Sequence, residues 1–120
     1  MKPIESQRLD SPAQLFKSGF VHSVYFWLKS DLSPEDVNRF ERALQQYVDE
    51  SGFATTGYIG KPAGTDREVV DNSYDYSLIV TFDDAATHEA YQNEEPHDRF
   101  RVVAKEMAAR VLIFDSSGLG

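Results

Sequence analysis

The chain has 120 residues, of which 41% are hydrophobic, and this predicts one soluble globular domain with a single core. Its 20 acidic and 12 basic residues give a net charge of −8, which disfavours nucleic acids and anionic membrane surfaces as partners. The chain has no cysteine and no segment with the pattern of a signal peptide or membrane span, so we expect a cytoplasmic protein without disulfides or thiolate chemistry.

The first predicted strand is the clearest element of the chain. Residues 1–18 before it are polar and irregular, and we expect an arm that is either flexible or docked on a partner. In residues 20–28, apolar side chains occupy both faces, so both faces should be covered. One face carries Phe20, His22, Val24, Phe26 and Leu28, and the other carries Val21, Ser23, Tyr25 and Trp27.

A helix is predicted to begin after Ser33, which suits the N-cap, with Pro34 at its first position. Apolar side chains recur at helical spacing, at Val37, Phe40, Leu44, Tyr47 and Val48. Ser51 and Gly52 are expected to end this helix, with Gly52 in the left-handed conformation common at helix ends.

The middle of the chain predicts two strands separated by a long polar loop. The first strand covers residues 55–59 and is weak, whereas the second covers residues 75–82 and alternates clearly. The loop between them covers residues 60–74. One face of the second strand carries Tyr76, Leu78, Val80 and Phe82, and we expect it to pack against the core.

The last third predicts two helices and a strand. Asp83 or Asp84 is expected to cap a helix that runs to about Asn93, and Pro96 is expected to open the next helix. The apolar stripe of that second helix consists of His97, Phe100, Val103, Ala104 and Met107. Residues 111–114 form the last predicted strand, and residues 116–120 form a small polar tail.

This order of elements is the split βαβ pattern of ferredoxin-like folds. We predict an α+β domain over residues 19–115, with an antiparallel four-stranded sheet and helices on one face. The other face carries Val21, Tyr25 and Trp27, and an apolar patch of this kind is rarely left in water. We therefore expect a homodimer in which two such faces pack together into a barrel.

Five segments of the chain, in this order, carry a resemblance to a known family. They are residues 20–29, Leu32-Ser33-Pro34-Glu35-Asp36, Gly60-Lys61-Pro62-Ala63-Gly64-Thr65, residues 70–78, and Tyr91-Gln92-Asn93 followed by His97. Together they resemble the stress-responsive A/B barrel (Dabb) family over about residues 19–115. The resemblance implies a dimeric α+β barrel and agrees with the fold read from the residues.

The resemblance also implies a candidate site. A few plant members of the family resemble cofactor-independent polyketide cyclases, in which a strand histidine, a helix tyrosine and a histidine after the helix break line a cavity. The matching positions are His22, Tyr91 and His97, and no cofactor is implied. A second strand histidine of the cyclases matches Tyr76, and the first histidine of the family string His-Pro-x-His matches Glu94.

Two functions stay open. The first is a barrel that binds a small hydrophobic or aromatic molecule between sheet and helices. Its expected lining includes Val24, Phe26, Tyr76 and Phe100. The second is a cofactor-independent enzyme in which His97 or His22 removes a proton and Tyr91 stabilises the oxyanion. Each of these three side chains also has a structural interpretation, as a hydrogen-bonded or packed residue of the core.

Other polar residues give weaker signals. His88 lies one helical turn before Tyr91, and we expect it to be an exposed helix residue. No metal site is expected, because the aspartates do not have the spacing of a calcium loop and are better explained as turn and cap residues. These aspartates are Asp71, Asp75, Asp83 and Asp84.

Overall fold

Seven elements make up the computed structural model of the protein, which describes residues 13–119. They are β1 (Phe20–Leu28), α1 (Pro34–Glu50), β2 (Thr56–Gly60), β3 (Tyr76–Phe82), α2 (Ala85–Gln92), α3 (Glu95–Met107) and β4 (Ala108–Ser117). This order confirms the predicted split βαβ pattern. Most of the predicted arm (residues 1–12) and the last residue of the predicted tail lie outside the described residues.

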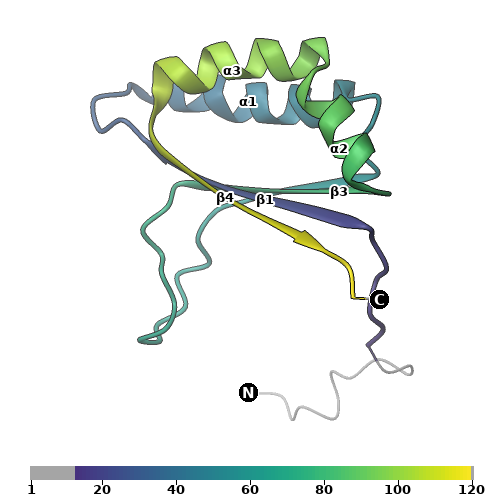
Figure 1. The fold of residues 1–120 in the computed structure, drawn as a ribbon. Coiled ribbons are helices and arrows are strands. Elements are labelled where there is room, and N and C mark those ends of the chain that lie inside the picture. Colours follow the sequence, from purple (N-terminus) through teal and green to yellow (C-terminus); the bar gives the residue numbers. More distant parts are fainter. Residues whose placement is uncertain (1–12, 120) are drawn as a thin grey trace.

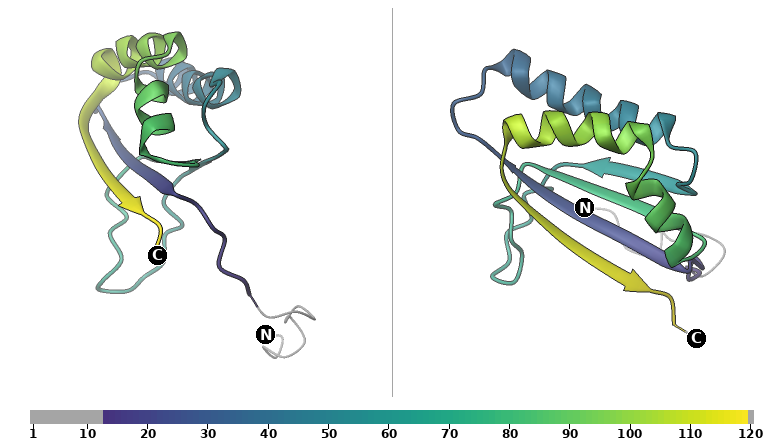
Figure 2. Two further views of the ribbon diagram at one scale, coloured as in Figure 1. Left: turned by 45° about the vertical axis from the view of Figure 1, so that its right-hand side comes forward. Right: turned by 45° about the horizontal axis from the view of Figure 1, so that its top comes forward.

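The four strands form one antiparallel sheet in the order β2-β3-β1-β4. The three helices lie on one face of this sheet, and the long loop between β2 and β3 projects beyond the other face (Figure 1). The two further views in Figure 2 show the same two layers, with α3 beside α1 above the sheet. The arrangement confirms the predicted α+β, ferredoxin-like class.

The hydrophobic core lies between the sheet and the helices. In the register of β1 and β3, Val24 lies opposite Leu78 and Phe26 lies opposite Tyr76, so alternate side chains of both strands point to the helices. The helices complete the core with buried apolar side chains. These are Phe40, Leu44 and Tyr47 of α1, Tyr91 of α2, and Phe100 and Met107 of α3.

Side-chain caps begin two of the three helices where the sequence predicts them. The Ser33 hydroxyl accepts a hydrogen bond from the Asp36 amide at 3.1 Å, and the Asp84 carboxylate accepts one from the Thr87 amide at 2.8 Å. Each bond satisfies a backbone amide that has no partner inside the first helical turn. Helix α3 instead begins with Pro96 in its first turn, and Glu94 before it forms no side-chain cap.

The prediction of a left-handed Gly52 at the end of α1 is wrong. The helix ends at Glu50, its capping residue Ser51 has an extended backbone, and among the described residues only Gly64 has a positive φ. The Ser51 hydroxyl accepts hydrogen bonds from the amides two and three residues further on. The Glu94 carboxylate accepts bonds from the Ser51 hydroxyl at 2.6 Å and from the Gly52 amide at 2.9 Å. In a left-handed cap, the Gly52 amide would donate its hydrogen bond to a carbonyl of the helix. Here it donates to the carboxylate of Glu94, which comes from a distant segment.

Strand β4 is longer than the predicted strand at residues 111–114. It pairs with β1 from one end to the other, and Phe20 lies opposite Ser117. Ser116 and Ser117 of the predicted tail therefore belong to the sheet. The residues at this end of β4 are polar, so no hydrophobic alternation predicted a strand there. They are extended because their backbone groups pair with those of β1.

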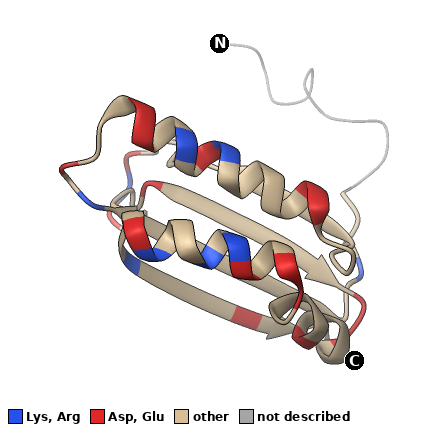
Figure 3. Cartoon of the chain, turned by 90° about the horizontal axis from the view of Figure 1, so that it is seen from above, with Lys and Arg blue, Asp and Glu red and all other residues tan. Residues whose placement is uncertain are grey.

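The strands carry few charges compared with the helices. Only Arg110 and Asp115, both in β4, are charged strand residues in the described chain, whereas acidic and basic residues are distributed along the helices and loops (Figure 3). On the sheet face away from the helices, Tyr58 and Phe114 expose 60% and 58% of their surface. Among the described residues, no helix has the length and hydrophobicity needed to cross a membrane.

Candidate functional site

A groove with a volume of about 670 Å³ lies between α3 and the sheet. Its floor consists of alternate residues of β1 and β4, and one of its walls is α3. The lining includes His22, Val24, Val111 and Ile113 from the strands and His97 and Phe100 from α3. The volume lies in the range of roughly 300–1,000 Å³ that is usual for small-molecule sites.

The groove exists because α3 does not cover the edge strand. Val111 lies opposite Phe26 and Ile113 lies opposite Val24, so both point to the helix side of the sheet. Val111 and Ile113 are nevertheless 45% and 48% exposed, whereas Val24 and Phe26 are buried. Two branched apolar side chains therefore form an open floor beside a packed core.

The groove brings together five of the seven residues predicted for the site. His22, Val24, Phe26, His97 and Phe100 all line it, although their proposed roles stay predictions. The sixth, Tyr91, is fully buried behind the groove, with its ring centroid 6.1 Å from that of His22 and 5.9 Å from that of His97. The seventh, Tyr76, lies elsewhere, and its hydroxyl donates a hydrogen bond to Glu41 at 2.7 Å.

Two polar atoms beside the groove are buried without a partner. Within residues 13–119, neither the Tyr91 hydroxyl nor the Nδ1 atom of His97 has a hydrogen-bond partner. Leaving such a group unsatisfied costs about 1–3 kcal/mol, so packing alone does not explain these two residues. Of these two side chains, His97 lines the groove, whereas Tyr91 does not.

Burial sets the protonation of these two side chains. Burial lowers the pKa of His97, and the nearby positive charge of Arg101 lowers this pKa further. The imidazole of His97 is therefore neutral near pH 7 and can accept a proton. Burial also raises the pKa of Tyr91, so its hydroxyl keeps its proton and can donate a hydrogen bond.

His22 has a carboxylate and a second imidazole beside it. Its Nδ1 atom is 2.5 Å from the Oδ1 atom of Asp115 and 3.3 Å from the Nε2 atom of His88. Asp115 reaches this position because it lies directly opposite His22 in the pairing of β4 with β1. His22 is buried, whereas the Asp115 side chain is 40% exposed.

The expectation of an exposed His88 is wrong. Only 7% of this residue is exposed, and its ring is stacked on that of Phe20 with centroids 4.2 Å apart. Burial, which is the largest cause, and the neighbouring His22 both lower the pKa of His88. The signal for its burial was its position one turn before Tyr91, on the face of α2 that packs against the sheet. Asp115 gave no signal of its own, because its position depends on the register of two strands far apart in the sequence.

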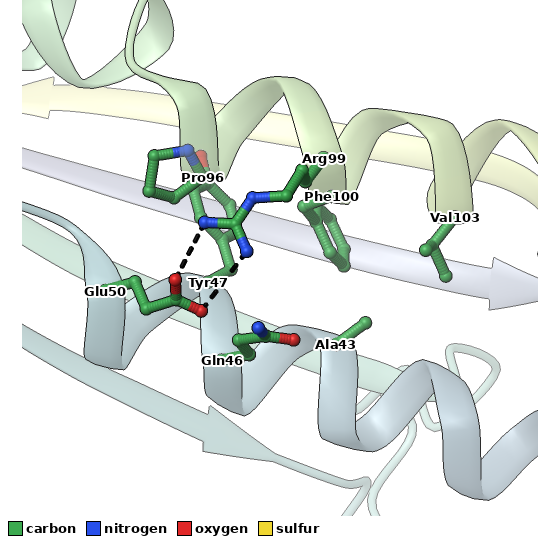
Figure 4. A pocket seen from close by; sticks show the side chains of 8 residues that line it. All are labelled: Ala43, Gln46, Tyr47, Glu50, Pro96, Arg99, Phe100 and Val103. Carbon is green, nitrogen blue, oxygen red and sulfur yellow. Dashed lines mark hydrogen bonds and ion pairs between the residues drawn. The ribbon is translucent and has the colours of Figure 1, made fainter.

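A second, smaller pocket lies between α1 and α3 (Figure 4). Its volume is about 90 Å³, too small for a typical ligand. The guanidinium of Arg99 on α3 reaches across it and pairs with the carboxylate of Glu50 on α1 at 2.7 Å. We interpret this pocket as part of the contact that holds α3 beside α1, above the groove.

The fold and the groove together define a ferredoxin-like α+β domain with an open cavity between its sheet and its last helix. The chain belongs to the stress-responsive A/B barrel domain family, whose family model matches residues 20–117. This confirms the resemblance drawn from the sequence. No curated protein sequence matches the chain.

Solved structures share this fold at low sequence identity. A Dabb family protein from Mesorhizobium loti has 20% identity and a TM-score of 0.70, and the match covers 87% of this chain and 100% of that one. A hydroxynitrile lyase from Passiflora edulis has 14% identity and a TM-score of 0.71, with 82% and 91% covered. A dimeric ferredoxin-like protein of unknown function from Thermobifida fusca has 18% identity and a TM-score of 0.68, with 83% and 91% covered.

Proposed function

We propose that the protein is a homodimer that binds a small hydrophobic or aromatic molecule in the groove between α3 and strands β1 and β4. The observation that carries this proposal is the open apolar floor of the groove, with the imidazoles of His22 and His97 in its lining. Val111 and Ile113 are about half exposed and would be covered by such a ligand. His22 and His97 would bind its carbonyl or hydroxyl groups.

The rim of the groove supports a ligand with polar substituents. Arg101 and Lys105 line it from α3, together with Asp98. These charged groups lie next to the apolar wall formed by Phe100 and the floor formed by Val111. A flat aromatic ring that carries oxygen substituents matches this lining better than a purely aliphatic chain does.

The open face of the sheet supports the homodimer. Val21, Tyr25 and Trp27 lie on this face with Leu112 and Phe114 of β4. Burying even about 600 Å² of such a face would favour association by about 15 kcal/mol, before the entropy losses of association are subtracted. Residues 13–19 and the β2–β3 loop both project on this side of the sheet, where they would flank a second copy (Figure 1). The relative from Thermobifida fusca is described as dimeric, which agrees with this arrangement.

Ligand binding can be tested with a fluorescent probe and a variant that fills the groove. Ala104 lines the groove from α3, and Ala104→Phe would fill part of it, whereas Ala86→Phe adds the same bulk to an exposed position of α2. We expect anilinonaphthalene sulfonate to bind the unchanged protein and Ala86→Phe similarly, and to bind Ala104→Phe at least tenfold more weakly. Equal binding by both variants, with both folded by circular dichroism, would contradict the proposal.

A second candidate function is cofactor-independent acid–base catalysis in the same groove. It is favoured by the neutral imidazole of His97 and by the buried hydroxyl of Tyr91, which has no hydrogen-bond partner in the described part of the chain. In this reaction, His97 takes a proton from a carbon next to a carbonyl group, and the electron pair of the C–H bond moves into the enolate. The Tyr91 hydroxyl donates a hydrogen bond to the enolate oxygen. One relative with this fold is an enzyme, the hydroxynitrile lyase from Passiflora edulis.

Deuterium exchange into the methyl group of acetophenone tests this chemistry without knowledge of the natural substrate. We expect the protein to accelerate the exchange in D₂O, followed by NMR, and His97→Gln to reduce the acceleration by about 10²–10⁴-fold. The thermal midpoint of His97→Gln should stay close to that of the unchanged protein. If the variant exchanges acetophenone at the same rate as the unchanged protein, His97 is not the base.

A further inference from the structure

Three side chains of the kinds that bind metals converge at the end of the groove. His22 comes from β1, His88 from α2 and Asp115 from β4, so each belongs to a different element. One possible ligand atom from each of the three lies within 4.8 Å of the other two. The groove and the cluster share only His22, because His88 and Asp115 do not line the groove.

Hydrogen bonding alone does not satisfy this cluster. The Nδ1 atom of His22 carries at most one proton, yet it faces both the Asp115 carboxylate at 2.5 Å and the Nε2 atom of His88 at 3.3 Å. If that proton is donated to Asp115, the His88 nitrogen has no comparable donor in the cluster. A divalent cation would instead accept a lone pair from each of the three groups.

The surroundings hold the two imidazoles in place. His22 and His88 are 5% and 7% exposed, and the rings of Phe20 and Phe82 contact the His88 ring on two sides, stacked and edge-on. Rigid support of this kind is what lets ligands keep the geometry that a metal requires.

The Asp115 carboxylate provides a negative charge for a cation and a route to the cluster from solvent. Asp115 lies on the edge strand, and its side chain is 40% exposed, so an ion can enter from solvent on this side. Metal–ligand distances of about 2.1 Å place neighbouring ligands roughly 3.4 Å apart in a tetrahedral site. The 3.3 Å separation of His22 and His88 already matches this value, whereas the Asp115 oxygen, 2.5 Å from His22, would have to move outward by about 1 Å.

We propose that His22, His88 and Asp115 form a binding site for a divalent transition-metal ion such as Zn²⁺. Two imidazoles and one carboxylate suit zinc as well as other first-row divalent ions, and three protein ligands leave a position open for water or for a molecule in the groove. This departs from our expectation from the sequence, in which no metal site was predicted. The proposal does not depend on ligand binding or catalysis in the groove.

Metal titration of the full chain tests the site directly. Protein stripped with EDTA is titrated with ZnCl₂ by calorimetry, and native mass spectrometry counts the bound ions. We expect one Zn²⁺ per chain and a higher thermal midpoint, because the ion binds only the folded protein. In parallel, Co²⁺ should give the intense visible absorption of a tetrahedral site with nitrogen and oxygen ligands. If the unchanged protein binds neither ion, the proposal is wrong.

His88→Gln and Asp115→Asn each change one member of the cluster, and His97→Gln is the control. We expect His88→Gln and Asp115→Asn each to weaken Zn²⁺ binding by more than the roughly 10–100-fold typical of an outer-shell partner. His97→Gln removes an imidazole outside the cluster and should bind Zn²⁺ like the unchanged protein. Equal weakening by His97→Gln, or full binding by Asp115→Asn, would overturn the assignment. Asp115→Asn replaces a partly exposed side chain, so it keeps the test available if His88→Gln does not fold.

Discussion

Asp115 lies directly opposite His22 in the pairing of β4 with β1, and the two side chains touch at 2.5 Å although 93 positions separate them. The contact lies on the helix side of the sheet, next to the groove. It links the edge strand, which provides the open floor, to a histidine that the sequence already indicated as chemically important. The pairing of these two strands therefore determines both the shape of the groove and the surroundings of His22.

Asp115→Asn should change the proton position on His22 in metal-free protein. The carboxylate accepts a hydrogen bond from Nδ1 and so favours the tautomer protonated there, whereas an amide can donate to that atom and removes the preference. Two-dimensional ¹⁵N NMR of the imidazole distinguishes the two tautomers. We expect Nδ1–H in the unchanged protein and a shift toward Nε2–H in the variant. An unchanged spectrum would show that Asp115 does not orient His22.

Phe114→Lys should dissociate the proposed homodimer. Phe114 is 58% exposed on the open face of the sheet, and in a two-fold dimer the substitution would bring two new charges into one interface. Val102→Lys is the control, because Val102 is 69% exposed on the helix side. Sedimentation should give about twice 13.6 kDa for the control and 13.6 kDa for Phe114→Lys. Dissociation of both variants, or of neither, would place the interface elsewhere.

The stability of the protein should fall in mild acid, in part because of His97. Burial lowers the pKa of His97, so near and below pH 6.5 the unfolded chain binds a proton that the folded chain resists. The stabilisation from neutral His97 is therefore present above about pH 6.5 and is lost as the pH falls toward the folded pKa. The groups that influence it are Arg101 and Asp98 on α3, Glu94 before α3, and His22 on β1.

Urea denaturation at pH 7.5 and pH 5.5 measures this effect. We expect the free energy of unfolding to decrease between these values, and to decrease less in His97→Gln, which has no proton to bind at this position. The comparison isolates His97 from the other titrating groups, because all of them are present in both proteins. The same decrease in both proteins would mean that His97 titrates alike in the folded and unfolded chains.

Tyr91→Phe should stabilise the fold while impairing the groove chemistry. The variant removes a fully buried hydroxyl that has no hydrogen-bond partner within bonding distance among residues 13–119, so we expect the free energy of unfolding to rise by about 1 kcal/mol. Tyr76→Phe is the matched control and should lower stability, because the Tyr76 hydroxyl donates to Glu41. Thermal and urea denaturation of both variants give the comparison. Destabilisation by Tyr91→Phe would show that the hydroxyl has a structural role.

Glu94→Gln should destabilise the protein by about 1–2 kcal/mol, since the carboxylate accepts two hydrogen bonds at the end of α1. Glu89→Gln on the exposed side of α2 is the control and should change stability by less than about 0.5 kcal/mol. Urea denaturation at pH 7.5 measures both. Equal effects would indicate a general response to lost negative charge. Glu94 occupies the position of the first histidine in the family string His-Pro-x-His. A larger effect of Glu94→Gln than of Glu89→Gln would show that this position has a structural role in this chain.

Local patterns in the sequence predicted most of the fold. The alternation of residues 20–28 predicted β1 with the bounds that the structure shows. Ser33 marked one helix start, and the pair Asp83 and Asp84 marked another, because caps depend on neighbouring residues. The end of α1 was predicted wrongly because it depends on Glu94, a residue that a local pattern does not connect with Gly52. Such contacts follow from tertiary packing and not from propensity.

In the candidate site too, residues with a local signal were predicted and residues placed by tertiary contacts were missed. His22 and His97 were predicted from their apolar neighbours and from a resemblance, and both line the groove. Asp115 and the burial of His88 were missed, because the first depends on strand register and the second on how closely α2 packs against Phe20. Tyr76 was predicted on a correct strand face, but that part of the face lies under α1, as its contact with Glu41 shows.

Native mass spectrometry of the freshly purified protein tests the central claim most directly, because it reports assembly and bound molecules together. Our account predicts a species of two chains that carries additional mass from a small organic molecule, which Ala104→Phe loses and Ala86→Phe keeps. A single chain of 13.6 kDa at micromolar concentration, with no added mass in any variant, would contradict it.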